Sequence, residues 1–215
     1  MSTGGAIAVI DYGMGNLRSV WQALAHVAAG REVLVTSDPA TLLAAERVVF
    51  PGQGAMPDCM RELDARGLRA AVLEASRSKP FLGICIGQQM LFEHSEEGDV
   101  AGLGVFTGQV RRFPAARMVD PLGNRLKVPH MGWNEVRQVA AHPLWQGVDD
   151  GARFYFVHSY YVDPLDHACA AGRTDYGIPF TSVVARDNIF AMQCHPEKSA
   201  QAGLAVLANF IRWNP

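Results

Sequence analysis

The first half of the chain alternates short apolar runs with longer segments in which apolar residues recur every three to four positions. The short runs predict buried strands, and the periodic segments predict amphipathic helices. Strands are expected at residues 6–11, 32–36, 47–50 and 81–84. Helices are expected at residues 16–29, after Pro39 and at residues 57–78, with a break at Gly67. This order is typical of a parallel sheet with helices on both faces.

Polar residues mark where three helices begin. Asn16 stands where a capping residue is expected, because a short polar side chain can accept bonds from unpaired helical N–H groups. Asp38 followed by Pro39 is typical of a helix start, since proline suits the first helical position. Ser199 is expected to begin a closing amphipathic helix at residues 199–213.

After about Gly98 the pattern changes to strand-like segments separated by turn residues. These segments lie at residues 104–113, 127–139, 153–162, 167–174 and 180–194. We expect them to complete a mixed, mostly parallel sheet and to form a small antiparallel side sheet. No repeat or long linker interrupts the chain, so residues 1–215 are predicted to form one α/β domain.

The composition of the chain mainly argues against certain classes of partner and site. The chain has 19 basic and 21 acidic residues, a formal charge of −2, which gives no electrostatic support for a nucleic acid or an anionic membrane as partner. No uncharged apolar run approaches the roughly 18 residues that a membrane span needs, and the start lacks the features of a signal peptide. The four cysteines form no C-x-x-C pair. We therefore expect free thiols in the cytoplasm, with no metal site and no cofactor.

One cysteine occupies a position that favours chemistry. Cys85 lies where the apolar run 81–84 ends and a helix-like run begins, with Gly83 and Gly87 two residues to either side. This is the spacing of the G-x-S-x-G nucleophile elbow, with sulfur in place of oxygen. A helix N-terminus favours a thiolate, and the N–H of Ile86 is placed to receive an oxyanion. The alternative is a buried core cysteine in a plain strand–turn–helix.

A cysteine nucleophile needs a base and a group that orients the base. Of the seven histidines, His195 stands out because Glu197 follows two residues later, and side chains two apart in an extended segment share a side. The alternative is a surface turn before the last helix. Cys194 is a rival nucleophile by proximity, but as the direct neighbour of His195 on a strand it points the opposite way.

A glycine-rich loop supplies a second candidate for oxyanion stabilisation. Gly52, Gln53 and Gly54 leave the predicted strand 47–50, and glycine permits peptide orientations that other residues resist. An N–H group of this loop is expected to face a substrate carbonyl. A plain glycine turn is the alternative.

Together, the stretches "PGQGAM", "GICIGQQMLFE" and "HPEKS" resemble the class I glutamine amidotransferases. The resemblance implies a flavodoxin-like α/β domain that hydrolyses the side-chain amide of glutamine through a Cys-His-Glu triad. It implies that Cys85 is the nucleophile, that His195 is base and acid, and that Glu197 orients His195. It also implies the oxyanion donors Gly52, Gln53 and Ile86.

Within that family, "DYGMGN", "FEHSEEG", "VPHMGWN" and "FYFVHSYYV" are similar to the glutaminase subunits of imidazole glycerol phosphate synthase. This likeness implies substrate contacts at Gln89 and Glu97, and at Ser159 and Tyr160 through their backbone. Glu97 suits the ammonium group of glutamine, and backbone N–H groups suit its carboxylate.

The likeness also implies a partner, a (β/α)8 cyclase that would receive the ammonia in histidine biosynthesis. Its products would be imidazole glycerol phosphate and an aminoimidazole carboxamide ribotide. Asn16, Trp133 and Lys198 match positions that the family uses at that interface. Hydrolysis is expected to be slow without the partner, because the flexible glycine loop would hold its donors misaligned at rest.

The chain departs from the family pattern at two positions. Gln53 stands where an apolar residue is more frequent, and Cys194 stands where an aromatic residue is usual. Three other functions remain open from the sequence: a glutaminase serving chorismate or purine metabolism, a cysteine peptidase or esterase on a similar elbow, and a binding module without catalysis.

Overall fold

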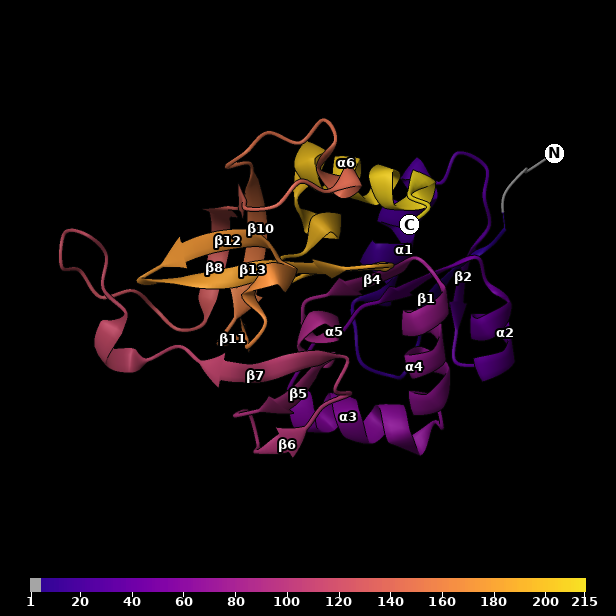
Figure 1. Cartoon of the computed structure of the whole chain (residues 1–215), viewed down its shortest axis with the longest axis horizontal. Helices are drawn as coiled ribbons and strands as arrows, with labels where there is room; N and C mark the ends of the chain where they lie inside the picture. Colours follow the sequence, from indigo (N-terminus) through magenta and orange to yellow (C-terminus); the bar gives the residue numbers. More distant parts are fainter. Residues whose placement is uncertain (1–4) are drawn as a thin grey trace.

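A mixed sheet runs through the molecule, and the first half of the chain builds its parallel part (Figure 1). The computed structural model describes residues 5–215. The parallel strands are β1 (Ile7–Ile10), β2 (Val33–Thr36), β3 (Arg47–Phe50), β4 (Phe81–Ile84) and β14 (Ile189–Met192). Their order, β2-β1-β3-β4-β14, is that of a flavodoxin-like sheet. Four of these strands are buried throughout, which explains their continuous apolar runs.

Helices cover both faces of these strands. They are α1 (Leu17–Val27), α2 (Pro39–Ala44), α3 (Met56–Ala65), α4 (Arg69–Ser78), α5 (Ile86–Gln89) and α6 (Ala200–Arg212). In Figure 1, α1 and α6 lie on one side of the parallel strands, and α3 and α4 lie on the other. The predicted break at Gly67 is confirmed, with a positive φ of +66° between α3 and α4. None of the helices in residues 5–215 is long and apolar enough to cross a bilayer.

The predicted helix starts differ in their capping. Asp38 is confirmed as a cap, since its carboxylate accepts bonds from the N–H groups of Ala40 and Thr41. Asn16 precedes α1, but its side chain makes no capping bond. Ser199 precedes α6 and instead bridges two segments: its Oγ donates to the carbonyl of His195 over 2.6 Å and accepts from the N–H of Tyr155 over 2.9 Å.

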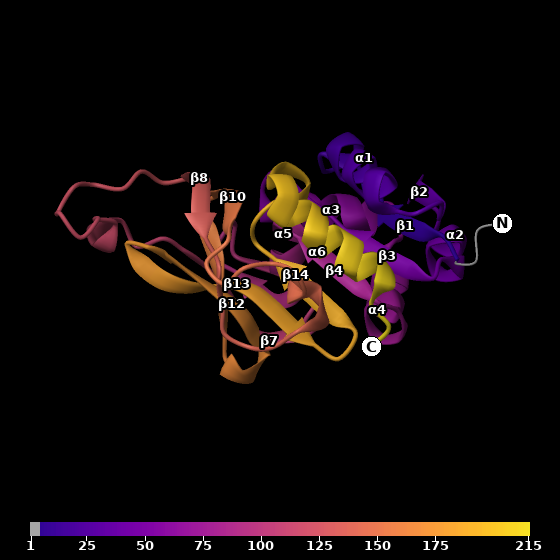
Figure 2. The same cartoon turned by 90° about the horizontal axis from the view of Figure 1, so that it is seen from above.

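The second half of the chain extends the sheet with mostly antiparallel strands. These are β5 (Phe92–Ser95), β6 (Val100–Ala101), β7 (Phe106–Arg112), β9 (Arg137–Gln138), β11 (Tyr160–Pro164), β12 (Ala170–Tyr176) and β13 (Ile178–Arg186). A separate antiparallel pair joins β8 (His130–Glu135) to β10 (Arg153–His158). In Figure 2 this pair lies on the far side of α6 from α2. The predicted mixed sheet with a small antiparallel side sheet is confirmed.

The helix after Cys85 is shorter than the helix-like run that leads out of it. Only residues Ile86–Gln89 form α5, and the chain then enters β5 at Phe92. Phe92 pairs with Phe106 on β7 and stacks on its ring, with the ring centres 5.6 Å apart. Tertiary pairing of this kind overrides local helix propensity.

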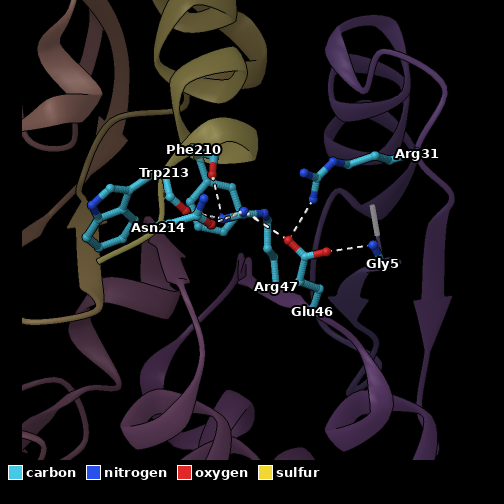
Figure 3. A network of polar contacts seen from close by, with 7 residues as sticks. All are labelled: Gly5, Arg31, Glu46, Arg47, Phe210, Trp213 and Asn214. Carbon is cyan, nitrogen blue, oxygen red and sulfur yellow. Dashed lines mark hydrogen bonds and ion pairs between the residues drawn. The ribbon is translucent and has the colours of Figure 1, made fainter. Parts of the chain in front are cut away.

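A buried arginine ties the end of the chain to the parallel sheet (Figure 3). Arg47, at the start of β3, donates to the carbonyl oxygens of Phe210 and Trp213 and, over 2.6 Å, to the side-chain oxygen of Asn214. Its guanidinium also pairs with Glu46 over 3.0 Å. Because the last carbonyl groups of a helix lack partners within it, Arg47 anchors the end of α6 on the sheet.

Candidate active site

Cys85 lies on a strained turn between β4 and α5. Its φ of 56° and ψ of −113° are unusual for a residue with a side chain. A Cβ at Gly83 would lie 2.8 Å from the Cβ of Ala191 on β14, and one at Gly87 would overlap the carbonyl oxygen of Phe50 at the end of β3. The predicted elbow is confirmed as a strand–turn–helix, and neighbouring strands impose both glycines.

His195 and Glu197 form a buried pair beside this turn. The Nδ1 of His195 lies 2.9 Å from Oε1 of Glu197, and their side chains are 6% and 1% exposed. The opposite ring nitrogen, Nε2, has no hydrogen-bond partner within residues 5–215. His195 lines the same pocket as Cys85. The carboxylate can therefore hold the imidazole while Nε2 remains available to exchange a proton in the pocket.

Opposing effects act on the charge of His195. Burial disfavours the imidazolium, but the negative charge of a Cys85 thiolate and the Glu197 carboxylate raise the pKa of His195 to about 10. The imidazolium is thus the stable form at neutral pH while the thiolate is present. Such a pair combines a nucleophile with the acid that its leaving group needs.

Cys194 is separated from this arrangement. It is fully buried and does not line the pocket that contains Cys85. Burial raises the pKa of its thiol well above the usual value. A buried thiol of this kind is inert, so the geometry favours Cys85 over Cys194 as the nucleophile.

One pocket of about 360 Å³ brings most of the predicted site residues together. Its lining contains nine of them, namely Gln53, Cys85, Ile86, Gln89, Glu97, Ser159, Tyr160, His195 and Lys198. Glu197 is not in the lining but contacts His195. Gly52, Asn16 and Trp133 are not in the lining either. Trp133 instead lines a larger cavity of about 780 Å³, which contains none of the triad.

Two of the predicted substrate contacts have partners within the protein. Oε2 of Glu97 accepts from the N–H of Met56 over 2.8 Å, which satisfies a free N–H at the start of α3. Nε2 of Gln89 donates to the carbonyl of Tyr160 over 3.1 Å and to Oε1 of Gln193 over 2.9 Å. Oε1 of Gln89 is buried without a partner in the described part of the chain. It is therefore an acceptor available to a ligand.

The glycine loop after β3 packs directly against the elbow. A Cβ at Gly52 would overlap the hydroxyl of Tyr12 and lie 3.3 Å from the backbone nitrogen of Gly87. Gly54 has a φ of +104°, which other residues rarely adopt. Between them, the carbonyl of Gln53 accepts from the thiol of Cys59 over 3.5 Å. Because Gly52 has no side chain, the loop can pack closely against the start of α5, directly after Cys85.

Comparison with known proteins identifies the family. The model of the class I glutamine amidotransferases matches residues 8–213. The protein called imidazole glycerol phosphate synthase subunit HisH in Dechloromonas aromatica is 69% identical over 212 residues, which cover 99% of this chain and 98% of that protein. The HisH subunit of Aromatoleum aromaticum is 70% identical over 209 residues, with 97% and 99% covered. The chain belongs to the HisH group of class I glutamine amidotransferases.

Solved structures agree on the fold. PurLQS from Thermotoga maritima aligns with a TM-score of 0.72 over 98% of this chain and 99% of that one, at 18% identity. At this identity the likeness concerns the fold alone. The class I amidotransferase fold expected from the sequence is confirmed by the family match and by this neighbour.

A pair of contacting histidines, to which the sequence analysis gave no role, has one member in the lining of the pocket that contains Cys85. His158 lines it, and its Nδ1 lies 2.8 Å from the carbonyl oxygen of Tyr160. Its Nε2 lies 2.9 Å from Nδ1 of His130 on β8. Burial lowers the pKa of His158 to about 3 and that of His130 to about 4. Both rings are therefore neutral at neutral pH. His158 holds the Tyr160 backbone, and His130 supports His158. The sequence signal for this pair was the position of each histidine in an apolar, strand-like segment.

Of the three predicted interface residues, one lines the pocket that contains Cys85. Lys198 lines it, and its ammonium group lies 5.8 Å from the centre of the Tyr155 ring. Trp133 on β8 is 46% exposed and lies 6.3 Å from the same ring. Asn16 precedes α1, which contacts the turn Pro196–Lys198. Residues 5–215 contain no group of three or more His, Cys, Asp or Glu side chains placed to hold a metal ion.

Proposed function

We propose that this chain hydrolyses glutamine to glutamate and ammonia and supplies the ammonia to a (β/α)8 cyclase partner. The partner would make imidazole glycerol phosphate and aminoimidazole carboxamide ribotide in histidine biosynthesis. The observation that carries the proposal is the buried His195–Glu197 pair in one pocket with Cys85 on its elbow. The whole chain acts as a single glutaminase domain in the cytoplasm.

The first half of the reaction forms a thioester. The Cys85 thiolate attacks the side-chain amide carbon of glutamine, and the carbonyl electrons move to oxygen. The N–H of Ile86 and an N–H of the Gly52–Gln53 loop stabilise this oxyanion. His195, protonated at rest, gives its proton to the amide nitrogen, and ammonia leaves as the carbonyl reforms.

The second half restores the enzyme. Neutral His195 takes a proton from water, and the resulting hydroxide attacks the thioester carbon. The C–S bond breaks, glutamate leaves, and the Cys85 thiolate again faces the imidazolium. Glu197 keeps the ring in place through both halves, because its contact is with the nitrogen that does not exchange the proton.

Substrate recognition uses the two charged ends of glutamine. Glu97 binds the ammonium group, aided by the free Oε1 of Gln89. Backbone N–H groups of Ser159 and Tyr160 bind the carboxylate. All four residues line the pocket that contains Cys85, which supports these assignments.

The partner face includes Asn16, Trp133 and Lys198. Lys198 lies at the pocket, and Trp133 presents an exposed aromatic surface close to it across Tyr155. Exposed aromatic residues are frequent binding hot spots. Ammonia released at Cys85 would leave on this side.

The test is a glutaminase assay titrated with the candidate cyclase and its phosphoribosyl substrate. We expect hydrolysis to be slow for the chain alone and to rise when both are added, and we expect a Cys85→Ser variant to remain inactive in either case. Equal rates with and without the cyclase and ligand would refute the activation. Turnover by Cys85→Ser would refute the nucleophile, and co-purification with a chorismate-binding subunit instead would refute the partner.

A further inference from the structure

A buried glutamine side chain lies against Cys85, the proposed nucleophile. Gln193 is fully buried, and its Nε2 lies 3.7 Å from the sulfur of Cys85. The register of β4 and β14 explains this position, because Ile84 pairs with Met192 and the next residue of each strand follows at the same edge. Gln193 therefore reaches the elbow from the strand that also leads to His195.

The orientation of this amide follows from its neighbours. The carbonyl oxygen of Tyr160 can only accept, so the group of Gln89 that faces it must be the amide nitrogen. The same nitrogen lies 2.9 Å from Gln193, which must present its oxygen there. The nitrogen of Gln193 is left to face Cys85. The Tyr160 carbonyl thus fixes the orientation of both amides, Gln89 and then Gln193, in the series of hydrogen bonds that ends at the Cys85 sulfur.

We propose that Gln193 is a further catalytic residue, which donates its amide N–H to the Cys85 sulfur and stabilises the thiolate that attacks glutamine. This inference rests on the proposed function of Cys85. A hydrogen bond to the charged form of a group favours that form, and a donor fixed before the reaction needs no reorganisation during it. The same bond directs the sulfur lone pairs, so the thiolate is both favoured and aimed.

The strength of the hydrogen bond from Gln193 to the sulfur changes during the reaction. It is strongest while the sulfur carries a full charge and weakens once the sulfur is part of a neutral thioester. Loss of the donor should therefore slow the steps up to thioester formation. We expect kcat/KM for glutamine to fall about tenfold, equivalent to the effect of one pH unit on thiolate formation.

Other titratable groups around the sulfur keep their state in the test. Glu197 contacts the far side of His195 and remains in place. Burial raises the pKa values of the nearby Tyr12, Cys59 and Cys194, the second of these to about 11. The negative charge of the Cys85 thiolate raises these three pKa values further, which keeps the groups neutral, and it raises the pKa of His195 to about 10, which keeps the ring charged. A change in the reactivity profile of Cys85 then reports on the substituted amide.

The experiment compares Gln193→Met and Gln193→Glu with Gln88→Met. Gln88 is an equally buried glutamine whose Nε2 donates to the carbonyl of Ala191 over 3.1 Å. Its only bond to Cys85 in the described chain is between backbone atoms, from its N–H to the Cys85 carbonyl over 3.0 Å, and Gln88→Met preserves this bond. Full-length protein with its cyclase is treated with iodoacetamide across a range of pH, and alkylation of Cys85 is followed by peptide mass spectrometry, which separates it from the other cysteines. Melting temperatures report on folding.

We expect the pH midpoint of Cys85 alkylation to rise by about one unit in Gln193→Met and further in Gln193→Glu, where a carboxylate faces the sulfur. Gln88→Met should keep the midpoint of the unsubstituted chain. An unchanged midpoint in either folded Gln193 variant, or an equal shift in Gln88→Met, would overturn the inference. The proposed function fails separately, if alkylation of Cys85 leaves glutaminase activity intact.

Discussion

The backbone N–H of Cys85 donates to the carbonyl oxygen of Met192 over 2.8 Å, which joins the elbow to the strand that leads into His195. The two residues are far apart in sequence, and the parallel pairing of β4 with β14 brings them to one edge. A slip of one residue in that register would reverse the side on which each side chain lies. The relative position of sulfur and imidazole thus depends on strand pairing in the core.

The charge of His195 gives the first prediction. Burial lowers its pKa, but the Cys85 thiolate and Glu197 raise it to about 10, above the ordinary 6.5. Cys85→Ala removes one of these charges, so the pKa of the His195 ring should fall markedly when followed by NMR titration. A ring that titrates at the same pH in both proteins would contradict the proposed ion pair.

The same pKa has a consequence for stability. Because the folded-state pKa of His195 lies above its unfolded value, protonation stabilises the fold fully below pH 6.5 and this contribution is lost as the pH rises toward 10. The free energy of unfolding in urea should therefore decrease over this interval, and by less in Cys85→Ala. An equal decrease in both would argue against coupling of the two residues.

The His130–His158 pair is predicted to make the fold less stable in acid, whereas protonation of His195 makes it more stable. Both folded-state pKa values lie below 6.5, at about 4 and about 3, because burial disfavours the charged rings. The unfolded chain therefore takes up protons first, and stability falls as the pH drops below 6.5. The expected slope is about 1.4 kcal/mol per pH unit for each histidine. His158→Gln should show a shallower decline between pH 6.5 and 4 in urea denaturation, and an unaltered slope would refute this.

Glu97 is predicted to act on substrate binding. Glu97→Gln preserves an acceptor for the N–H of Met56 but removes the negative charge that we propose binds the ammonium group of glutamine. We expect KM for glutamine to rise about tenfold with little change in kcat. Glu96→Gln is the matched control, because Glu96 accepts from the N–H of Arg112 and does not line the pocket. Equal KM values in the two variants would exclude the role.

Arg47 is predicted to control stability rather than activity. Arg47→Met leaves the carbonyls at the end of α6 and the Glu46 carboxylate without their buried partner, so the free energy of unfolding should fall by about 3 kcal/mol. Arg31→Met removes the other, partly exposed partner of Glu46 and should cost less than about 1 kcal/mol. Urea denaturation of both variants makes the comparison. Similar losses would show that the C-terminal anchor is not the source of the effect.

The proposed triad, which stays a prediction, could be proposed from sequence because its signals are local. The spacing of Gly83, Cys85 and Gly87 reflects the steric demands of a tight turn, and His195 and Glu197 are two residues apart. Each of these patterns can therefore be recognised without knowledge of the rest of the fold. The parallel strands could be predicted for a similar reason, because a strand that is buried on both faces requires a continuous apolar run.

The parts that sequence analysis missed depend on tertiary contacts. β5 is strand because Phe92 stacks on Phe106, although the local run is helix-like. Gln193 directs its nitrogen at Cys85 because Gln89 and Tyr160, from other segments, dictate the orientation of its amide. No spacing in the sequence encodes such a relationship. A local signal can also fail: Asn16 is a residue type typical of helix caps, but its side chain makes no capping bond here.

The most direct test of the account is to trap the thioester. Because His195 is proposed to act in both halves of the reaction, substituting it would also stop thioester formation, so the test uses the unsubstituted chain during turnover of glutamine. Peptide mass spectrometry after rapid acid quenching, with the cyclase and its ligand present, is predicted to find a glutamyl group attached to Cys85. A glutamyl group on Cys194, or continued hydrolysis of glutamine by a Cys85→Ala chain, would contradict the account.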